Sequence, residues 1–344
     1  MPKFVRIQQK NPAEVAGQVA AGLARGPAVV PVLGGHCVLG RDRVCLARFG
    51  SPYRLVTADV LDTELAGLEQ PFRERARKAM AGPLVAEFGP GRSGVALAVE
   101  PLAREIVSCA GGEVWLGVPE EETGPEELVR ELGKEASVVV SGGAGGPGPT
   151  VVDFGARPAV VDRRGKLAIL DLERELGELV LLGPGLYFSV LVVCTGNSCR
   201  SPMARAMLVN MLEGTPALVS SAGTAAPVGS PATAQAVEAM NEVGLDLTRH
   251  RAQQLVTGMV RVADLVLVME DYHRQQVLGL APDAAGRTRL LLSFAGKDER
   301  VEDPVGFPIE VYRLTRGVMK PALERVAAEV RKRAGRKESP EPTT

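Results

Sequence analysis

The fold of the second half of this chain is set by the stretch Leu191-Val192-Val193-Cys194-Thr195-Gly196-Asn197-Ser198-Cys199-Arg200-Ser201-Pro202-Met203-Ala204. Residues 187–193 are nearly all apolar and rich in β-branched side chains, which predicts a strand buried on both faces. A polar loop follows, and Ser201 with Pro202 predicts the start of a helix. The loop therefore joins a strand to the N-terminus of a helix.

A loop in that position favours bound anions. Its successive backbone N–H groups point into one concavity, and the helix dipole adds partial positive charge that lowers the pKa of a nearby thiol. We therefore expect Cys194 to be a thiolate nucleophile, and Arg200 to offer a planar pair of donors to two phosphate oxygens. Ser201 is placed to donate a hydrogen bond to the sulfur. The predicted chemistry is cleavage of a phosphate ester.

The string C-T-G-N-S-C-R-S-P-M-A, directly after an apolar strand, resembles the active-site signature of the low-molecular-weight protein tyrosine phosphatases. The alternative is a structural strand-turn-helix with a buried cysteine. The resemblance implies a doubly wound parallel-sheet α/β domain, a phosphocysteine intermediate on Cys194 and a phosphate ligand in Arg200. It also implies a phosphate-binding loop that comprises Thr195, Gly196, Asn197, Ser198, Cys199 and Ser201.

Matches to this family continue beyond the loop. Asp303-Pro304 in V-E-D-P-V-G corresponds to the family's acid loop, which implies that Asp303 is the general acid and then the general base. Ser221 in S-A-G-T and His250 in R-H-R-A-Q-Q correspond to residues that hydrogen-bond the loop asparagine, here Asn197. The segment 264–269 matches a D-x-x-x-x-M strand, for which only a structural role is expected.

The side chain at position 198 bears on the substrate. Bacterial protein-arginine phosphatases that resemble this family carry a small hydroxylated residue there, whereas typical tyrosine phosphatases carry a bulky aliphatic one. Ser198 could leave room and a hydrogen-bond partner for a guanidinium. Residues 225–228 and 305–306 put no aromatic ring at the rim, although Tyr272 and Phe307 could supply one. Phosphotyrosine is expected on the breadth of the family, with phosphoarginine as the alternative.

Cysteine usage adds a redox question. Among relatives, a cysteine in the position of Cys199 can form a reversible disulfide with the nucleophile, here Cys194. The interpretation of Cys199 as a small residue that only fills space is equally favoured. Arsenate reductases that share this loop use further downstream cysteines, and none follows Cys199. All five cysteines are irregularly spaced, which suggests neither a disulfide framework nor a zinc site. No metal or cofactor is expected.

Composition points to a two-domain soluble protein. The chain has 344 residues, is 45% hydrophobic and carries a net charge of −1, so it gives no argument for a nucleic-acid or membrane partner. No apolar signal core or membrane-length run is present, and a cytoplasmic protein is expected. A phosphorylated protein is the expected substrate and partner. Nothing in the sequence sets an oligomeric state.

The first half alternates strands and helices. The order of its elements, with A-G-P-L at 81–84 and S-G-G followed by P-T-V-V-D at 149–153, resembles threonylcarbamoyl-AMP synthase over roughly residues 10–170. The resemblance implies a twisted α/β domain. The family's threonine- and tyrosine-bearing strand appears here as residues 31–37, its Lys-Arg-Pro motif has no counterpart near 48–54, and its Ser-x-Asn segment is replaced by acidic residues at 118–122.

These departures indicate a degenerate domain kept for binding, regulation or folding support, since lost cations and added carboxylates disfavour a triphosphate. Two alternatives stay open. The domain could still make threonylcarbamoyl-adenylate from ATP, threonine and bicarbonate, or it could sense a nucleotide, a double-stranded RNA or a phosphoprotein.

The expected organisation is a synthase-like domain over 1–184, a phosphatase domain over 185–331 and a flexible tail over 332–344. Within the first domain, one helix is expected from Thr63 to about Met80, and a pair of strands around a turn over 158–170. In the second, strands and helices alternate up to a long final helix over 309–331.

Overall fold

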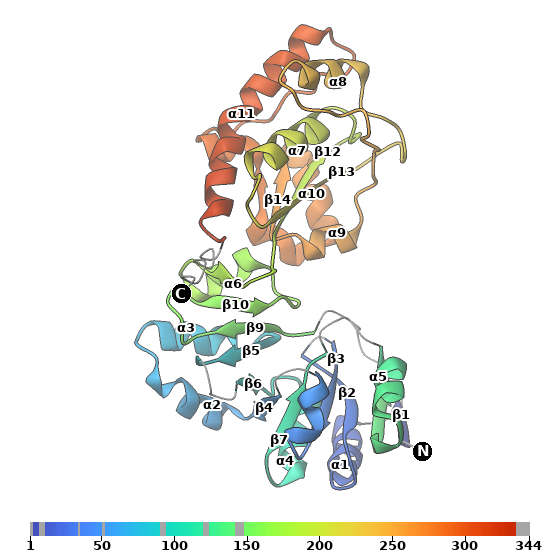
Figure 1. The fold of residues 1–344 in the computed structure, drawn as a ribbon, viewed down its shortest axis with the longest axis vertical. Coiled ribbons are helices and arrows are strands. Elements are labelled where there is room, and N and C mark those ends of the chain that lie inside the picture. Colours follow the sequence, from blue (N-terminus) through green and yellow to red (C-terminus); the bar gives the residue numbers. More distant parts are fainter. Residues whose placement is uncertain are drawn as a thin grey trace, which may run out of the picture. The chain divides into compact units, whose positions relative to one another are not determined.

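The computed structural model describes residues 3–6, 11–33, 35–49, 52–89, 94–119, 124–141 and 148–334. Packing divides the chain into unit 1, Met1–Leu167 with Leu172–Val180, and unit 2, Ala168–Asp171 with Leu181–Thr344 (Figure 1). Residues 168–171 and 181–184, which were expected to belong to the first domain, thus pack in the second unit. The glycine-rich segment 142–147 and residues 335–344 of the predicted tail lie outside the described residues.

Unit 1 is built on a mixed sheet. Its strands are β1 (Lys3–Arg6), β2 (Ala28–Val32), β3 (Gly35–Gly40), β4 (Tyr53–Val56), β5 (Leu84–Glu87), β6 (Val95–Leu97), β7 (Val114–Gly117), β8 (Val138–Ser141), β9 (Thr150–Asp153) and β10 (Val160–Arg163). They follow the order β1-β8-β2-β3-β7-β4-β6-β5-β9-β10. The β2–β3 hairpin is antiparallel, whereas β1 and β2 both run parallel to β8.

Helices pack on this sheet through apolar faces. They are α1 (Pro12–Leu23), α2 (Ala58–Glu64), α3 (Phe72–Ala79), α4 (Pro101–Ala110) and α5 (Pro125–Leu132). In α1, Asn11 caps the helix, Pro12 occupies the first turn, and Val15, Val19 and Leu23 bury one face. α1 and α4 pack against each other over the core. None of the helices in the described part of the chain is long and apolar enough to cross a bilayer.

Two expectations about unit 1 are wrong. The single helix from Thr63 to Met80 is two helices, because α2 ends at Glu64 and α3 begins at Phe72 after Gly67 and Pro71 interrupt the pattern. The strand pair over 158–170 is also absent. β10 instead pairs antiparallel with β9, and the residues after it lead into α6 (Ile169–Leu176).

Unit 2 contains a parallel sheet in the order β13-β12-β14-β15. The strands of this sheet are β12 (Phe188–Cys194), β13 (Ala217–Gly223), β14 (Leu265–Val268) and β15 (Thr288–Leu290). The short strand β11 (Leu181–Leu182) precedes them in the chain and is not part of this sheet. The helices are α7 (Arg200–Met211), α8 (Ala234–Asn241), α9 (Thr257–Val262), α10 (Asp271–Leu280) and α11 (Ile309–Arg331). This is the expected parallel-sheet α/β arrangement, and the final helix has the expected bounds.

The order of the strands in the sheet of unit 2 indicates where a ligand site is expected. The chain passes from β12 to β13 on one side and then to β14 on the other, so the order reverses at β12. In open parallel sheets, ligands bind at the carboxyl ends of the strands beside such a reversal. Residues 190–193 of β12 are buried, as expected for a strand covered on both faces. Cys194 is the last residue of this strand.

Candidate active site

The loop that follows β12 is short and ends directly in α7. That helix begins at Arg200, one residue before Ser201 and two before Pro202, so the sequence placed its start slightly too late. Pro202 still lies in the first turn, where a backbone N–H has no helical partner to lose. β12, β13 and β14 are neighbours in the sheet, so their ends lie beside this loop (Figure 1).

The sulfur of Cys194 has two donors. Its Sγ lies 3.0 Å from Ser201 Oγ, and the backbone N–H of Asn197 donates to it at 3.3 Å. The contact predicted between Ser201 and the sulfur is therefore present.

Cys194 sits in an environment that moves its pKa in both directions. Burial raises the pKa of the thiol, while hydrogen bonds from Ser201 and Asn197 and the charge of Arg200 lower it. Among these protein groups the net direction is upward, whereas the sequence led us to expect a lowered thiol pKa. The reason is enclosure, since Cys194 is 2% exposed.

Asn197 organises the loop from a left-handed backbone conformation, with φ 51°. Its Oδ1 accepts from the backbone N–H of Gln253 at 2.9 Å, which fixes the amide orientation because that N–H can only donate. Its Nδ2 then donates to Ser201 Oγ at 2.8 Å and to Ser221 Oγ at 3.0 Å. Since Ser201 Oγ accepts from Asn197, its own proton is free to point at the Cys194 sulfur.

His250 forms a hydrogen bond with the backbone of Asn197. Its Nε2 lies 2.7 Å from the Asn197 carbonyl oxygen and must donate to it, because a carbonyl only accepts. Burial lowers the pKa of His250. Ser221 and His250 are thus both brought to the asparagine to which the sequence assigned them.

Gly223 allows β13 to approach the loop. A Cβ at this position would lie 2.4 Å from the Thr195 carbonyl oxygen and 2.9 Å from the Asn197 nitrogen. The residues after it bind the same loop, since the N–H of Thr224 donates to the Cys194 carbonyl at 2.9 Å and that of Ala225 to the Thr195 carbonyl at 3.0 Å. Only glycine fits this contact.

Arg200 is buried at the mouth of the loop, with its side chain 3% exposed. Nη1 donates to Glu270 Oε1 and to the Val301 carbonyl, both at 3.0 Å. Nη2 donates to Asp303 Oδ2 at 2.5 Å and to Thr195 Oγ1 at 3.4 Å. Four of its five N–H groups therefore face protein acceptors, and a phosphate that takes two donors must replace at least one of these contacts.

Asp303 reaches the site on the segment between η6 (Leu291–Ala295) and α11. Its Oδ1 accepts from the backbone N–H of Val305 at 3.2 Å, so the side chain is held by its own turn as well as by Arg200. The carboxylate is partly exposed. It is therefore placed beside the phosphate ligand and within reach of solvent.

His273, on α10, is a site residue that the sequence analysis missed. Its side chain is fully buried, and Nε2 lies 2.9 Å from Thr195 Oγ1 and 3.7 Å from Glu270 Oε1. Burial and the charge of Arg200 lower its pKa to about 4. At neutral pH the imidazole is therefore uncharged.

Ser198 and Cys199 contact the segments that pack around the loop. Ser198 is half-buried, and its carbonyl accepts from the N–H of Thr233 at 3.0 Å. Cys199 is buried, with its sulfur 3.4 Å from Thr233 Oγ1 and 3.6 Å from the Tyr312 hydroxyl. These contacts fit the packing interpretation of Cys199. Gly196 leaves room for the Ser198 hydroxyl, which lies 3.1 Å from where a Cβ would be.

Sequence reasoning also missed Glu270 and Gln253. Glu270 directly follows the D-x-x-x-x-M strand, to which only a structural role was given. A usable signal was that a polar residue after a buried parallel strand lies at the ligand edge of the sheet. Gln253 acts through its backbone, which leaves no signal in residue type.

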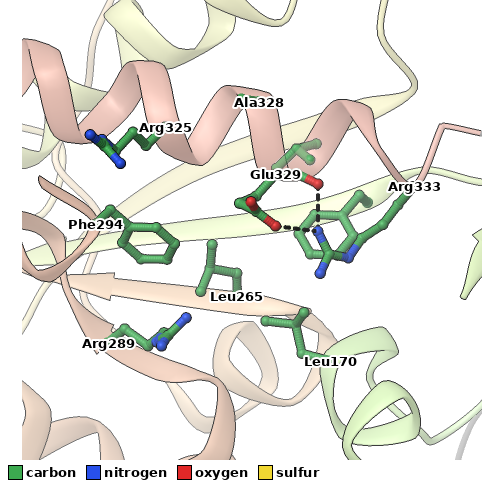
Figure 2. A pocket seen from close by; sticks show the side chains of 10 residues that line it. Leu170, Leu265, Arg289, Phe294, Arg325, Ala328, Glu329 and Arg333 are labelled. Atoms are coloured by element: carbon green, nitrogen blue, oxygen red, sulfur yellow. Dashed lines mark hydrogen bonds and ion pairs between the residues drawn. The ribbon is translucent and has the colours of Figure 1, made fainter. Parts of the chain in front are cut away.

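A separate hollow of about 400 Å³ lies elsewhere in unit 2 (Figure 2). It is lined by Phe188 and Leu265, which begin β12 and β14, so it lies at the opposite end of the strands from Cys194. Arg333 pairs with Glu329 there, and Arg289 and Arg325 are exposed. The hollow is therefore distinct from the Cys194 loop.

Comparison with known proteins gives a consistent set of similarities. Residues 189–336 match the family model of the low molecular weight phosphotyrosine protein phosphatases. A protein-arginine-phosphatase of Geobacillus stearothermophilus is 39% identical over 142 residues, which cover 41% of this chain and 94% of that protein. The low molecular weight protein-tyrosine-phosphatase Etp of Escherichia coli K12 is 36% identical over 148 residues, 43% of this chain and 95% of its own length. A solved arginine phosphatase from Geobacillus stearothermophilus is 37% identical, with a TM-score of 0.40, and the match covers 42% of this chain and 94% of that one.

Proposed function

We propose that this chain, which through residues 189–336 belongs to the low molecular weight phosphotyrosine protein phosphatase family, acts on phosphoarginine side chains of proteins. Membership of this family makes it a cysteine-based phosphatase. The observation that carries the choice of substrate is a second carboxylate, Glu270, which contacts Arg200 in addition to the general acid Asp303.

In the proposed reaction, the Cys194 thiolate attacks phosphorus while the bond between phosphorus and the guanidinium nitrogen breaks. Asp303 gives its proton to that nitrogen, and a phosphocysteine forms. Water then attacks the phosphocysteine, Asp303 takes a proton from the water, and the sulfur–phosphorus bond breaks. Inorganic phosphate leaves, and the thiolate is restored.

Arg200 and the loop stabilise the phosphoryl group during both steps. The backbone N–H groups of the loop and the guanidinium of Arg200 hold its oxygens. When Arg200 turns donors toward phosphate, it must release at least one of its four protein acceptors, two of which are the carboxylates of Glu270 and Asp303. A carboxylate released by Arg200 is then available to the leaving group.

Phosphoarginine fits these released acceptors. Its guanidinium carries several N–H donors and positive charge. The Glu270 carboxylate beside Arg200 offers acceptors of opposite charge, while Asp303 supplies the proton for the leaving nitrogen. Ser198 adds a small hydroxylated side chain at the position where the sequence predicted room for a guanidinium. A protein-arginine-phosphatase is among the relatives that this chain matches over nearly their whole length.

Phosphotyrosine is the second candidate. Tyr272 and Phe307 are 51% and 54% exposed and follow Glu270 and Asp303 respectively, so aromatic rings are available for stacking on a phenyl ring. Relatives named as tyrosine phosphatases also match this part of the chain.

Hydrolysis of phosphoarginine and phosphotyrosine peptides, side by side in chelating buffer, tests the proposal. The unmodified protein is expected to cleave phosphoarginine faster, and Cys194→Ser to cleave neither. Glu270→Gln should lower phosphoarginine cleavage more than phosphotyrosine cleavage. It weakens the contact with Arg200 for both substrates, and it also removes a negative charge opposite the guanidinium of phosphoarginine. Faster phosphotyrosine cleavage would favour the second candidate, and activity retained in Cys194→Ser would overturn the assignment of the nucleophile.

For unit 1 we propose a degenerate threonylcarbamoyl-AMP-synthase-like domain that binds a nucleotide or RNA. Support comes from its mixed sheet and from the turn after β2. Leu33 is left-handed there, with φ 54°, and its N–H donates to Glu100 at 2.8 Å. The second Glu100 oxygen is buried with no hydrogen-bond partner among the described residues.

Calorimetric titration of full-length Cys194→Ser with ATP and with double-stranded RNA tests this assignment. Heat of binding is expected with one of them, without release of pyrophosphate when threonine and bicarbonate are present. Pyrophosphate release would instead show that synthesis persists. If the protein binds neither ATP nor double-stranded RNA, the proposed ligand binding by unit 1 is wrong and the unit has only a structural role.

A further inference from the structure

His273 is a buried titratable group that the proposed reaction does not use. It lies on α10, seventy-eight positions from the loop residue that it contacts, and its Nδ1 is buried with no hydrogen-bond partner among the described residues. Burying a polar atom without a partner costs stability. The position therefore requires an explanation beyond the filling of space.

The neighbours of Nε2 decide where the imidazole proton lies. Nε2 faces Thr195 Oγ1 at 2.9 Å and Glu270 Oε1 at 3.7 Å, and a carboxylate oxygen can only accept. A proton on Nε2 makes the hydrogen bond to Thr195 and faces the negative charge of Glu270, whereas a lone pair on Nε2 would face that charge unfavourably. With the proton on Nε2, the unpaired Nδ1 is a lone-pair acceptor and not an N–H donor. This tautomer is favoured because a buried N–H without a partner is rarer than a buried acceptor without one. His273 Nε2 therefore donates to Thr195.

Thr195 passes this constraint to the phosphate ligand. Its Oγ1 accepts from His273 and, at 3.4 Å, from Arg200 Nη2. With both lone pairs engaged, the hydroxyl group is fixed, and its own proton is available to an acceptor in the site.

We propose that His273 is a positioning residue, which holds the Arg200 guanidinium at the loop through the Thr195 hydroxyl. This proposal rests on the phosphatase reaction proposed at Cys194. The charged groups that face the imidazole are Arg200, Glu270 and Asp303. The lowered pKa of His273 agrees with the assignment, because a second cation beside Arg200 is disfavoured and the neutral donor persists through the neutral range.

A double-mutant cycle tests the coupling. His273→Phe keeps a buried ring, His273→Gln keeps an N–H near the position of Nε2, and Thr195→Val removes the hydroxyl while keeping its shape. The readouts are kcat/KM for p-nitrophenyl phosphate, inhibition by inorganic phosphate, and the thermal midpoint of each variant. His273→Phe should lower kcat/KM about tenfold and weaken phosphate inhibition, the loss expected for one hydrogen bond near a charge.

The pattern among variants separates positioning from packing. His273→Gln should recover most of the activity, and the double variant His273→Phe/Thr195→Val should be no worse than Thr195→Val alone. A folded His273→Phe with unchanged kcat/KM and phosphate inhibition overturns the proposal. So do losses that multiply in the double variant, because the two residues would then act independently.

A measurement on the unmodified protein covers the case in which the His273 variants do not fold. Two-bond hydrogen–nitrogen NMR of the histidine rings should show His273 as the neutral tautomer with its proton on Nε2, unchanged from about pH 5.5 to about pH 8. A charged ring, or a proton on Nδ1, overturns the proposal. Absence of any hydrolysis by the unmodified protein would instead refute the proposed function, and the NMR result would still decide the hydrogen bond.

Discussion

The reactivity of Cys194 depends on a few donors that oppose its burial. Ser201 is one of them, at 3.0 Å from the sulfur, and it lowers a pKa that burial raises. Ser201→Ala should therefore move the thiol pKa further upward. Below that pKa the thiolate fraction falls, so kcat/KM near pH 6 should drop about tenfold and the acid side of its pH profile should move to higher pH.

Alkylation by iodoacetamide as a function of pH measures this shift directly on the thiol. The matched control is Ser293→Ala, which removes a serine whose hydroxyl donates to the Leu290 carbonyl at 2.7 Å outside the loop. It should leave the alkylation profile unchanged. An unmoved profile in Ser201→Ala would show that Ser201 does not tune the sulfur.

At the scale of single residues, the sequence pointed to the loop and to Ser221, His250 and Asp303 around it, but it missed Glu270 and His273. Cys194, Asn197 and Arg200 lie within one short segment, and their spacing alone implies their proximity. Glu270 and His273 reach Arg200 and Thr195 from α10 and the residue before it, across about seventy positions. Glu270 and His273 reach the site because β14 lies beside β12 in the sheet. No local sequence pattern predicts this pairing of strands.

Among the elements, the contact between β13 and the loop is the most restrictive. Gly223→Ala would place a methyl group 2.4 Å from the Thr195 carbonyl oxygen, so the loop must shift. We expect kcat/KM to fall at least tenfold while the sheet remains folded, since misplaced site groups cost activity more than stability. Kinetics and far-ultraviolet circular dichroism measure the two effects.

Gly258→Ala is the matched control for this substitution. Gly258 lies in α9, and a Cβ added there would have no atom within 4 Å, so alanine should be neutral or stabilising by about 0.5–1 kcal/mol. Equal activity in Gly223→Ala and Gly258→Ala would mean that the loop tolerates displacement.

Element boundaries were predictable where the apolar pattern was continuous. α11 has the expected bounds because buried positions such as Tyr312, Met319, Leu323 and Val330 recur along one face. The predicted helix from Thr63 to Met80 failed because charged residues on both sides of the break hid it, although Gly67 and Pro71 marked the place. α9 was missed because six residues carry too little periodicity.

For the whole molecule, the division between the units does not follow the turn at residues 183–185. The segment Ala168–Asp171 belongs to unit 2 and is held there by buried groups. The Asp264 carboxylate is fully buried and accepts from the N–H of Ile169 and that of Ser189, both at 2.8 Å. Arg287, 3% exposed, pairs with Asp171. The D-x-x-x-x-M strand thus has a specific structural role that its pattern alone did not reveal.

The stability of unit 2 should therefore depend on where a shortened chain begins. A chain of residues 185–344 lacks the N–H of Ile169 and the carboxylate of Asp171, whereas one of residues 168–344 keeps both. In the chain of residues 185–344, Arg287 keeps the exposed carboxylate of Asp283 at 3.6 Å but loses the more buried carboxylate of Asp171. We expect residues 185–344 to be less stable by about 2–4 kcal/mol, because a buried acceptor and a buried cation lose partners.

Thermal unfolding of the two shortened chains side by side measures the difference, which should be about 8 °C for a domain of this size. Asp171→Asn in the longer chain should reproduce part of the loss, and Asp283→Asn should change little because that carboxylate is exposed. Equal midpoints for the two chains would show that residues 168–184 contribute nothing to unit 2. The family match begins at residue 189, so that outcome would make the phosphatase fold complete without the segment that packs on it here.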